Sequence, residues 1–166
     1  MSESRSARWL WLALAVLAAD RATKECIERF TSPYYRLELI PHFAVLVHST
    51  NTGMAFGLFG EASAKWVSGF LMVIAAVVVG ALVWWLLSGR AATGLTQSAL
   101  ALIAGGAAGN FLDRLIHGGV TDFIELHAGS FVWPALNLAD SAITVGALLI
   151  LGEVFFSERH AAQQRT

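Results

Sequence analysis

Long apolar runs separated by shorter polar segments dominate the sequence. An α-helix needs about 20 mostly apolar residues to cross a bilayer, and four of the runs come close to that length. The clearest of them, residues 66–87, contains no charged side chain. The others cover about residues 9–27, 95–112 and 136–156. The pattern therefore predicts four transmembrane helices that form one domain over residues 1–166.

The first run has the shortest uninterrupted stretch of uncharged residues, because Asp20 follows directly after Ala19. A run of this length can also be the apolar region of a secretory signal peptide. However, Ala18, Ala19 and Asp20 do not form the small-residue cleavage site that such a peptide needs. We therefore predict an uncleaved span here.

The segments between the runs carry a different pattern, in which apolar and polar side chains alternate. This period of two, around residues 35–40 and 45–47, is typical of β-strands. Residues 120–127 and 131–133 flank a short turn at 128–130 and predict a hairpin.

Two long connections, about residues 28–65 and 113–135, follow the first and third spans and are expected on the same side of the membrane. The first also contains Glu61–Lys65, which predicts a helical turn with an ion pair at i, i+4 spacing. Together they predict a small β-rich platform. The predicted fold class is thus an all-α membrane protein with four transmembrane helices and a platform on its outer, periplasmic side.

Basic residues set the orientation of such a protein, because short cytoplasmic loops are enriched in Lys and Arg. An even number of spans places both termini on one side. Five arginines lie in the short tails and in the short loop at 88–94, namely Arg5, Arg8, Arg90, Arg159 and Arg165. The other basic residues are spread over much longer connections. The higher density of basic residues in the tails and the short loop predicts that both termini lie in the cytoplasm.

Composition narrows the class of protein further. The chain is 56% hydrophobic and 14% charged, whereas soluble proteins average about 45–50% and about 25%. A formal net charge of -1 with no basic stripe argues against a nucleic-acid partner. The single cysteine, Cys26, excludes an internal disulfide, and the five histidines show no metal-ligand spacing. We expect neither a metal nor another cofactor.

Polar residues gather at one membrane face, where the first and third spans end and the second and fourth begin. A carboxylate at the bilayer centre costs about 2.5–3.5 kcal/mol, so such residues usually serve a function. Asn137, Asp140, Ser141 and Thr144 share one helical face through their spacing. The residues that converge at this face are Asp20, Lys24, Asn110, Asp113, Arg114, Asp122, Asn137 and Asp140.

Two neighbouring carboxylates can act as an acid and a base, because the charge on one opposes ionisation of the other. Asp140 lies one turn into its helix, where the helix dipole favours the ionised form. The sequence lacks two motifs of other hydrolytic mechanisms, Gly-x-Ser-x-Gly and His-Glu-x-x-His. For a serine nucleophile activated by a lysine base, the chain offers only two lysines, Lys24 and Lys65.

Some polar and small residues also have a packing explanation. Gly105 and Gly109 make the third span thin and predict that a neighbouring helix approaches closely. Asp113 and Arg114 are adjacent, which leaves two interpretations open. They could form an ion pair that closes the helix end, or Arg114 could face the substrate.

Five blocks of the sequence resemble the lipoprotein signal peptidases (signal peptidase II) of bacteria. In order along the chain they are Asp20–Lys24, Asn51–Gly57, Gly109–Arg114, Val120–Phe123 and Leu136–Ile143. The resemblance implies an aspartyl endopeptidase of the bacterial cytoplasmic (inner) membrane, with its active site near the periplasmic face. Its implied partners are membrane lipid and a prolipoprotein with a diacylglyceryl-modified cysteine, before which the enzyme cuts.

By the same resemblance, Asp122 and Asp140 form the catalytic pair. The residues implied to support the site or bind substrate are Asn51, Gly53, Asn110, Arg114, Asn137, Asp20 and Lys24. The chain departs from the family at Arg21, where Gln is usual, at Met54, where Ala or Val is usual, and at Leu136, where Phe is frequent. These departures affect contacts with substrate and leave both aspartates in place.

Two other functions fit the polar cluster. A small proton-coupled transporter could use Asp20 and Asp140 as a relay, but transport sites usually lie near the membrane midplane, and here the carboxylates gather at one face. A non-enzymatic assembly factor could use the cluster only to hold four helices together. The interpretation that fits best is a monomeric peptidase.

Overall fold

The computed structural model describes residues 3–53, 61–88 and 93–163, with the side chains of 3–7, 61–65 and 157–163 excepted. Residues 54–57, part of one of the five blocks, and the predicted Glu61–Lys65 ion pair therefore lie outside the described residues and side chains.

Within these ranges the chain forms four helices and four strands. The helices are α1 (Glu3–Phe30), α2 (Glu61–Leu87), α3 (Gly94–His117) and α4 (Leu138–Gln163). The strands are β1 (Arg36–Ile40), β2 (Ala44–Asn51), β3 (Val120–Ala128) and β4 (Phe131–Leu136). Each apolar run predicted to span the membrane lies within a helix, except that α4 begins two residues after position 136.

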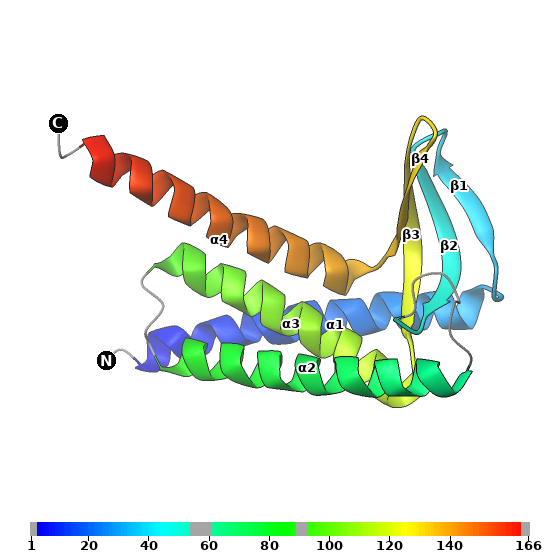
Figure 1. Cartoon of the computed structure of the whole chain (residues 1–166), viewed down its shortest axis with the longest axis horizontal. Coiled ribbons are helices and arrows are strands. Elements are labelled where there is room, and N and C mark those ends of the chain that lie inside the picture. Colours follow the sequence, from blue (N-terminus) through cyan, green and yellow to red (C-terminus); the bar gives the residue numbers. More distant parts are fainter. Residues whose placement is uncertain (1–2, 54–60, 89–92, 164–166) are drawn as a thin grey trace.

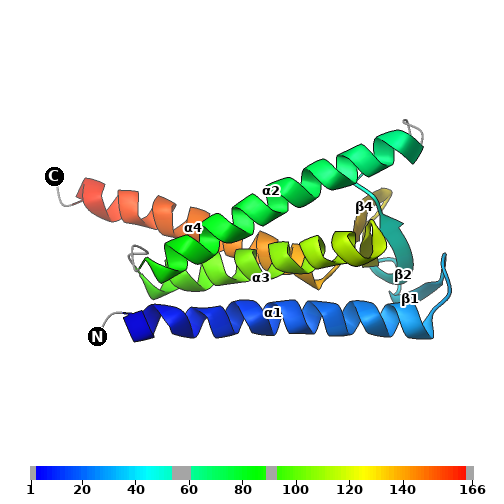
Figure 2. The ribbon, with the colours of Figure 1, turned by 90° about the horizontal axis from the view of Figure 1, so that it is seen from below.

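The helices lie side by side, and the strands form a sheet at one end of them, turned across their long axes (Figure 1). Both termini lie at the opposite end of the helices (Figure 1). Figure 2 shows α3 between α1 and α2, and α3 packs on α1, α2 and α4. The central helix therefore carries its polar C-terminal end directly toward the sheet.

Glycines on α3 allow the neighbouring helices to approach closely. A Cβ atom on Gly105 would lie 2.5 Å from the carbonyl oxygen of Ala13 on α1. A Cβ atom on Gly109 would collide with the carboxylate of Asp20. The close packing predicted at both glycines is confirmed.

Replacing Gly109 by Ala should therefore destabilise the protein by about 1–3 kcal/mol, because the added methyl group displaces the buried carboxylate of Asp20. Gly152→Ala on α4 is the matched control, since nothing lies within 4 Å of its Cβ position. The control should unfold at the wild-type temperature or slightly above it, because alanine is the better helix former. Thermal unfolding in detergent separates the two variants, and equal unfolding temperatures would contradict the close approach of α1.

The sheet is antiparallel, with the strand order β1-β2-β3-β4. β3 and β4 form the predicted hairpin, in which Ala128 is opposite Phe131. β1 and β2 form a second hairpin from the first connection. β2 pairs with β3 so that Asn51 is opposite Val120, and this places Asn51 beside the strand that carries Asp122.

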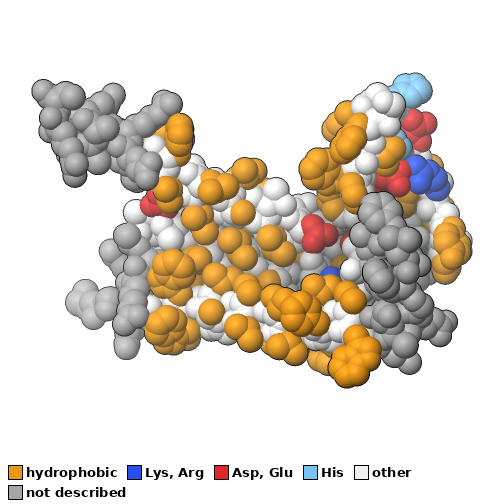
Figure 3. Space-filling view, viewed as in Figure 1, with side chains coloured by type: hydrophobic (Ala, Val, Ile, Leu, Met, Phe, Trp, Pro, Cys, Tyr) orange, Lys and Arg blue, Asp and Glu red, His pale blue; other side chains and the backbone are white. Residues whose placement is uncertain are grey.

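Three helices in the described part of the chain are long and apolar enough to cross a membrane. They are Trp66–Leu87 in α2, Gly94–His117 in α3 and Leu138–Phe156 in α4. Only 6% of the most apolar window of α2 is buried, against 44% for α3. On the face of the molecule seen in Figure 3, apolar side chains are spread along the length of the helices. Exposed apolar surface of this extent requires lipid rather than water around it, so the chain is built as an integral membrane protein.

Helix α1 is not among these three. Its residues 9–19 carry no charge, but its second half carries six charged residues, namely Asp20, Arg21, Lys24, Glu25, Glu28 and Arg29. Asp20 and Lys24 are nevertheless buried inside the protein. Its charged residues are therefore what distinguishes α1 from the three helices that are apolar enough to cross a membrane. A fourth span at residues 9–27 stays a prediction.

Candidate active site

Asp140 lies in the first turn of α4, and Asn137 directly precedes this helix. The side-chain oxygen of Asn137 accepts a hydrogen bond from the backbone N–H of Asp140 at 3.0 Å. In return, the backbone N–H of Asn137 donates to the Asp140 carboxylate at 3.4 Å. This reciprocal arrangement caps the helix and holds the carboxylate at the positive end of the helix dipole.

Asp122 lies on β3, and only 2% of its surface is exposed. One carboxylate oxygen accepts a hydrogen bond from Nδ2 of Asn137 at 2.7 Å, and the other accepts one from Nδ2 of Asn51 at 3.1 Å. The oxygen of Asn51 accepts from the backbone N–H of Gly53 at 2.8 Å. Gly53 has a φ of +81°, a conformation that favours glycine. The turn at Gly53 thus orients the amide of Asn51 toward Asp122.

Asn110 on α3 completes the network around the two carboxylates. Its Nδ2 donates to Oδ1 of Asp140 at 2.7 Å, and its oxygen accepts from Nδ2 of Asn137 at 3.3 Å. The side chain of Asn137 thus contacts both aspartates. Its amide nitrogen donates to the Asp122 carboxylate, and its amide oxygen accepts from the backbone N–H of Asp140. The structure brings together Asp122, Asp140 and the three asparagines that the sequence placed with them.

Burial sets the electrostatics of Asp122. Its pKa is raised from the ordinary value of 3.8 to about 6, chiefly because burial disfavours the charged carboxylate. The negative charge of Asp140 also raises this pKa, whereas hydrogen bonds from Asn51 and Asn137 and the charge of Lys24 lower it. Asp122 can therefore carry a proton near pH 6, as a general acid must.

Asp140 is half-buried and lines a groove of about 470 Å³ between β4 and α4. Figure 3 shows this hollow between the sheet and the helices. Ser141 and Thr144 line the same groove, which confirms that they share a face with Asp140. The apolar residues that line it are Leu126, Trp133, Pro134, Ala135, Leu136 and Val145. An apolar chain lying in this groove would have direct access to Asp140.

A family model described as signal peptidase (SPase) II matches residues 12–156 of the chain. The chain belongs to the signal peptidase II family. The lipoprotein signal peptidase of Ectopseudomonas mendocina is 42% identical to it over 156 residues, which cover 93% of this chain and 92% of the relative. The lipoprotein signal peptidase of Vibrio cholerae is 39% identical, covering 95% of this chain and 92% of the relative.

Two solved structures have a similar fold. A bacterial membrane enzyme determined at 1.9 Å resolution is 30% identical to this signal peptidase II family member and superposes on it with a TM-score of 0.78. The match covers 89% of this chain and 92% of that chain. A second structure of a bacterial membrane enzyme, determined at 2.3 Å, has the same TM-score at 29% identity and covers 92% of this chain and 90% of that chain.

Asp20 holds the helix that carries Asp140. One of its carboxylate oxygens accepts a hydrogen bond from the backbone N–H of Ala139 at 2.9 Å. This contact from α1 adds a second cap to α4 of the signal peptidase II fold, beside the one from Asn137. Asp20 therefore lies behind the pair and fixes its helix, an arrangement that suits a support better than a step in a proton relay.

Lys24 is fully buried and connects α1 to α3. Its ammonium group lies 2.8 Å from the Asp20 carboxylate and 3.1 Å from that of Asp113. It also donates a hydrogen bond to the side-chain oxygen of Asn110 at 3.0 Å. Because Lys24 binds that oxygen, the amide nitrogen of Asn110 is the end that faces Asp140.

Arg114 contributes positive charge next to the pair. One of its terminal nitrogens donates to the backbone oxygen of Asn110 at 3.2 Å, and its Nε is buried without a partner among the described residues. Asp113 does not serve as that partner, because its carboxylate pairs with Arg21 at 2.8 Å and with Lys24. Arg114 therefore keeps hydrogen-bond donors available beside the two aspartates.

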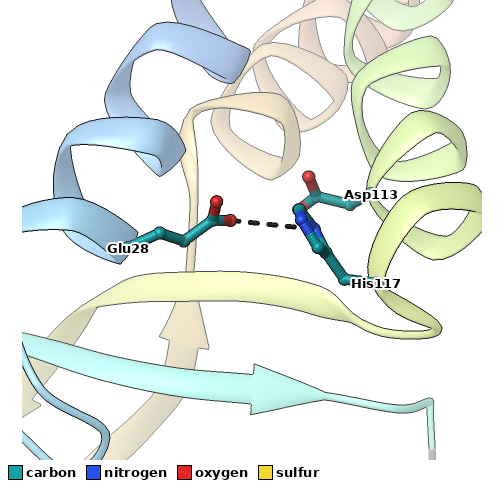
Figure 4. A group of neighbouring side chains, drawn as sticks. All are labelled: Glu28, Asp113 and His117. Atoms are coloured by element: carbon teal, nitrogen blue, oxygen red, sulfur yellow. Dashed lines mark ion pairs between the residues drawn. The ribbon is translucent and has the colours of Figure 1, made fainter.

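Glu28, Asp113 and His117 form a cluster that the sequence spacing did not predict. Figure 4 shows Glu28 on α1 facing the other two on α3, and their ligand atoms lie within 4.8 Å of one another. Arg21 donates hydrogen bonds to both carboxylates, so its positive charge already occupies the place that a metal cation would take. Spacing of i, i+4 and i+7 on α1 could have grouped Arg21, Glu25 and Glu28, but not their partners on α3.

Proposed function

We propose that this protein is an aspartyl endopeptidase of the bacterial cytoplasmic membrane that removes signal peptides from prolipoproteins. It cuts directly before a cysteine that carries diacylglyceryl. The observation that carries this proposal is that one asparagine, Asn137, contacts both Asp122 and Asp140 in a member of the signal peptidase II family. We assign the catalytic roles to these two aspartates.

The proposed reaction is the attack of a water molecule on the scissile carbonyl carbon. Asp140, as carboxylate, takes a proton from the water, and Asp122 gives its proton to the carbonyl oxygen, which forms a neutral gem-diol. In the second step Asp122 takes a proton back from the gem-diol, and Asp140 gives its proton to the amide nitrogen as the C–N bond breaks. The raised pKa of Asp122 supports its role as the group that is protonated at the start.

The asparagines and Arg114 support this chemistry in different ways. Asn51 and Asn137 donate to the oxygens of Asp122, and Asn110 donates to Asp140, so both carboxylates are held before substrate binds. We assign to Arg114 a contact with the substrate peptide, because it has donors left beside the pair. The reacting peptide would lie in the groove along α4, with its acyl chains toward the lipid.

We further propose that α1 is a fourth span, that both termini lie in the cytoplasm and that the sheet lies on the periplasmic side. α1 has 28 residues and is about 42 Å long, which exceeds the bilayer core. Two facts support the arrangement: the termini lie at the end of the helices opposite the sheet, and two charged residues of α1, Asp20 and Lys24, are buried inside the protein. The lipid surroundings and a monomeric state are part of this proposal.

Cleavage of a purified lipid-modified prolipoprotein, followed as a gel shift, tests the proposed function. The unmodified precursor is the control substrate, because the proposal requires diacylglyceryl on the cysteine. Turnover of the modified precursor alone is expected. Proton-coupled flux in liposomes without any cleavage would instead favour a transporter.

The pH dependence of kcat/KM tests the proton on Asp122. Because this proton is needed at the start of the reaction, activity should fall as the pH rises through the upper apparent pKa of the pair, expected near 6 in the free enzyme. Above that value the decrease should approach about tenfold per pH unit. A kcat/KM that stays constant from pH 5 to pH 8, or rises over that range, would contradict the assignment.

A further inference from the structure

Arg21 contacts three carboxylates at the end of α1 where the sheet begins. Its guanidinium nitrogens donate to Asp113 at 2.8 Å, to Glu28 at 2.7 Å and to Glu25 at 2.5 Å. The side chain of Arg21 is only 23% exposed, whereas that of Arg29 on the same helix is 71% exposed and, among the described residues, pairs only with Glu25. The two arginines therefore differ in burial and in the number of their partners.

Two of the partners of Arg21 hold the same residue, Thr121. Asp113 accepts a hydrogen bond from the backbone N–H of Thr121 at 3.0 Å, and Glu28 accepts one from its hydroxyl group at 2.8 Å. Thr121 is buried and directly precedes Asp122 on β3. Arg21, Asp113, Thr121 and Glu28 thus form a closed ring of hydrogen bonds that joins α1, α3 and β3.

We propose that Arg21 is a positioning residue for Asp122, acting through this ring; the proposal rests on the proposed peptidase function. Thr121 is fixed on one side by the two carboxylates that Arg21 holds. Asp122 is fixed on the other side by the amides of Asn51 and Asn137. A backbone held from both sides keeps the Asp122 carboxylate in one place against Asp140.

Arginine suits this position because its planar fork donates to two carboxylates at once. A lysine has the same charge, but its ammonium group is a single point that cannot bridge Asp113 and Glu28 in the same way. Lys24 contacts the other oxygen of Asp113, and His117 lies 3.8 Å from Glu28. In the described part of the chain, Lys24 therefore pairs with only one of these two carboxylates and His117 with the other, so neither bridges them as Arg21 does.

The test compares Arg21→Lys with Arg29→Lys, two substitutions that keep the charge on the same helix. Arg21→Lys should lower kcat about tenfold, since small displacements of a catalytic group have large effects on rate. Its KM should change by less than about twofold, because the groove that binds substrate is untouched. Arg29→Lys should retain the wild-type kcat and KM.

Substitutions of Thr121 test the second half of the ring. Thr121→Val removes the hydroxyl group that donates a hydrogen bond to Glu28, and Thr121→Ser keeps it. The valine variant should lose kcat to a similar extent, and the serine variant should recover most of it. The double variant of Arg21→Lys with Thr121→Val should be no slower than the slower single variant, because both changes break one ring.

Three results would overturn the proposal: a wild-type kcat in Arg21→Lys, an equal loss in Arg29→Lys, or fully multiplicative effects in the double variant. If Arg21→Lys does not accumulate in the membrane, the two Thr121 variants decide, and equal kcat values for valine and serine would overturn it. Absence of cleavage by the wild-type protein would instead refute the proposed function itself.

Discussion

Asp122→Asn and Asp140→Asn should each reduce the cleavage of a lipid-modified prolipoprotein by at least about 10²–10⁴-fold, the usual contribution of acid–base catalysis. Each aspartate both takes and gives a proton in the proposed reaction, so an amide at either position blocks both steps. A gel-shift assay on purified protein measures the loss. Appreciable turnover by either variant would refute the assignment of the pair.

The same variants separate a catalytic role from a structural one. Because the pKa of Asp122 is higher in the folded protein than its ordinary value of 3.8, its contribution to stability is present below about pH 4 and is lost as the pH rises through about 6. A neutral asparagine avoids that loss. Asp122→Asn should therefore reach the membrane and unfold near the wild-type temperature at neutral pH, whereas an assembly factor held together by this residue would lose folded protein.

Glu153→Gln is the matched control for these variants. Glu153 lies on the same helix as Asp140, at the end away from the sheet, where its carboxylate accepts hydrogen bonds from Thr93 and Thr96 of α3. The change removes a carboxylate charge from α4 without touching the groove. Cleavage by this variant should match the wild type, and a loss equal to that of Asp140→Asn would mean that any charge change on α4 stops the enzyme.

The sequence could place the candidate site because its residues sit at the ends of predictable elements. Asn110 ends one apolar run and Asn137 begins another, and the alternation of helices brings both ends to one side. The motif from Asn137 to Asp140 also encodes its own local geometry, since it is a helix cap. Such local patterns placed Asn110, Asn137 and Asp140 at one face, whereas the role of Asp122 and Asp140 as the pair and the role of Asn51 were implied by the family resemblance.

The features that the sequence did not predict depend on contacts between residues far apart in the chain. Alternation predicted strands in both long connections, but it carries no information on the pairing of β2 with β3, which joins those connections into one sheet. Likewise, nothing near Arg21 in the chain indicates that it would meet Asp113 and lie one contact away from Thr121. The charges on α1 lower its hydropathy, yet burial against α3 gives Asp20 and Lys24 partners that a scale of residue types cannot register.

Lys24→Met should destabilise the protein by about 3–5 kcal/mol, the usual cost of removing one partner from a buried ion pair. Lys24 is fully buried between the carboxylates of Asp20 and Asp113, and methionine fills its volume without its charge. Two like charges would then face each other inside the protein. Thermal unfolding in detergent and the yield of membrane-inserted protein measure the effect. Arg29→Met, which removes an exposed positive charge from the same helix, should change either quantity little.

A second substitution shows whether charge is the cause. Adding Asp20→Asn to Lys24→Met removes one uncompensated carboxylate, while the amide oxygen can still accept the hydrogen bond from Ala139 that caps α4. The double variant should therefore be more stable than Lys24→Met alone. Its activity per folded molecule should stay low, because the oxygen of Asn110 has lost the ammonium group that orients its amide toward Asp140. If stability and activity return together, Lys24 serves only to neutralise buried charge; if stability returns alone, Lys24 also positions the catalytic pair.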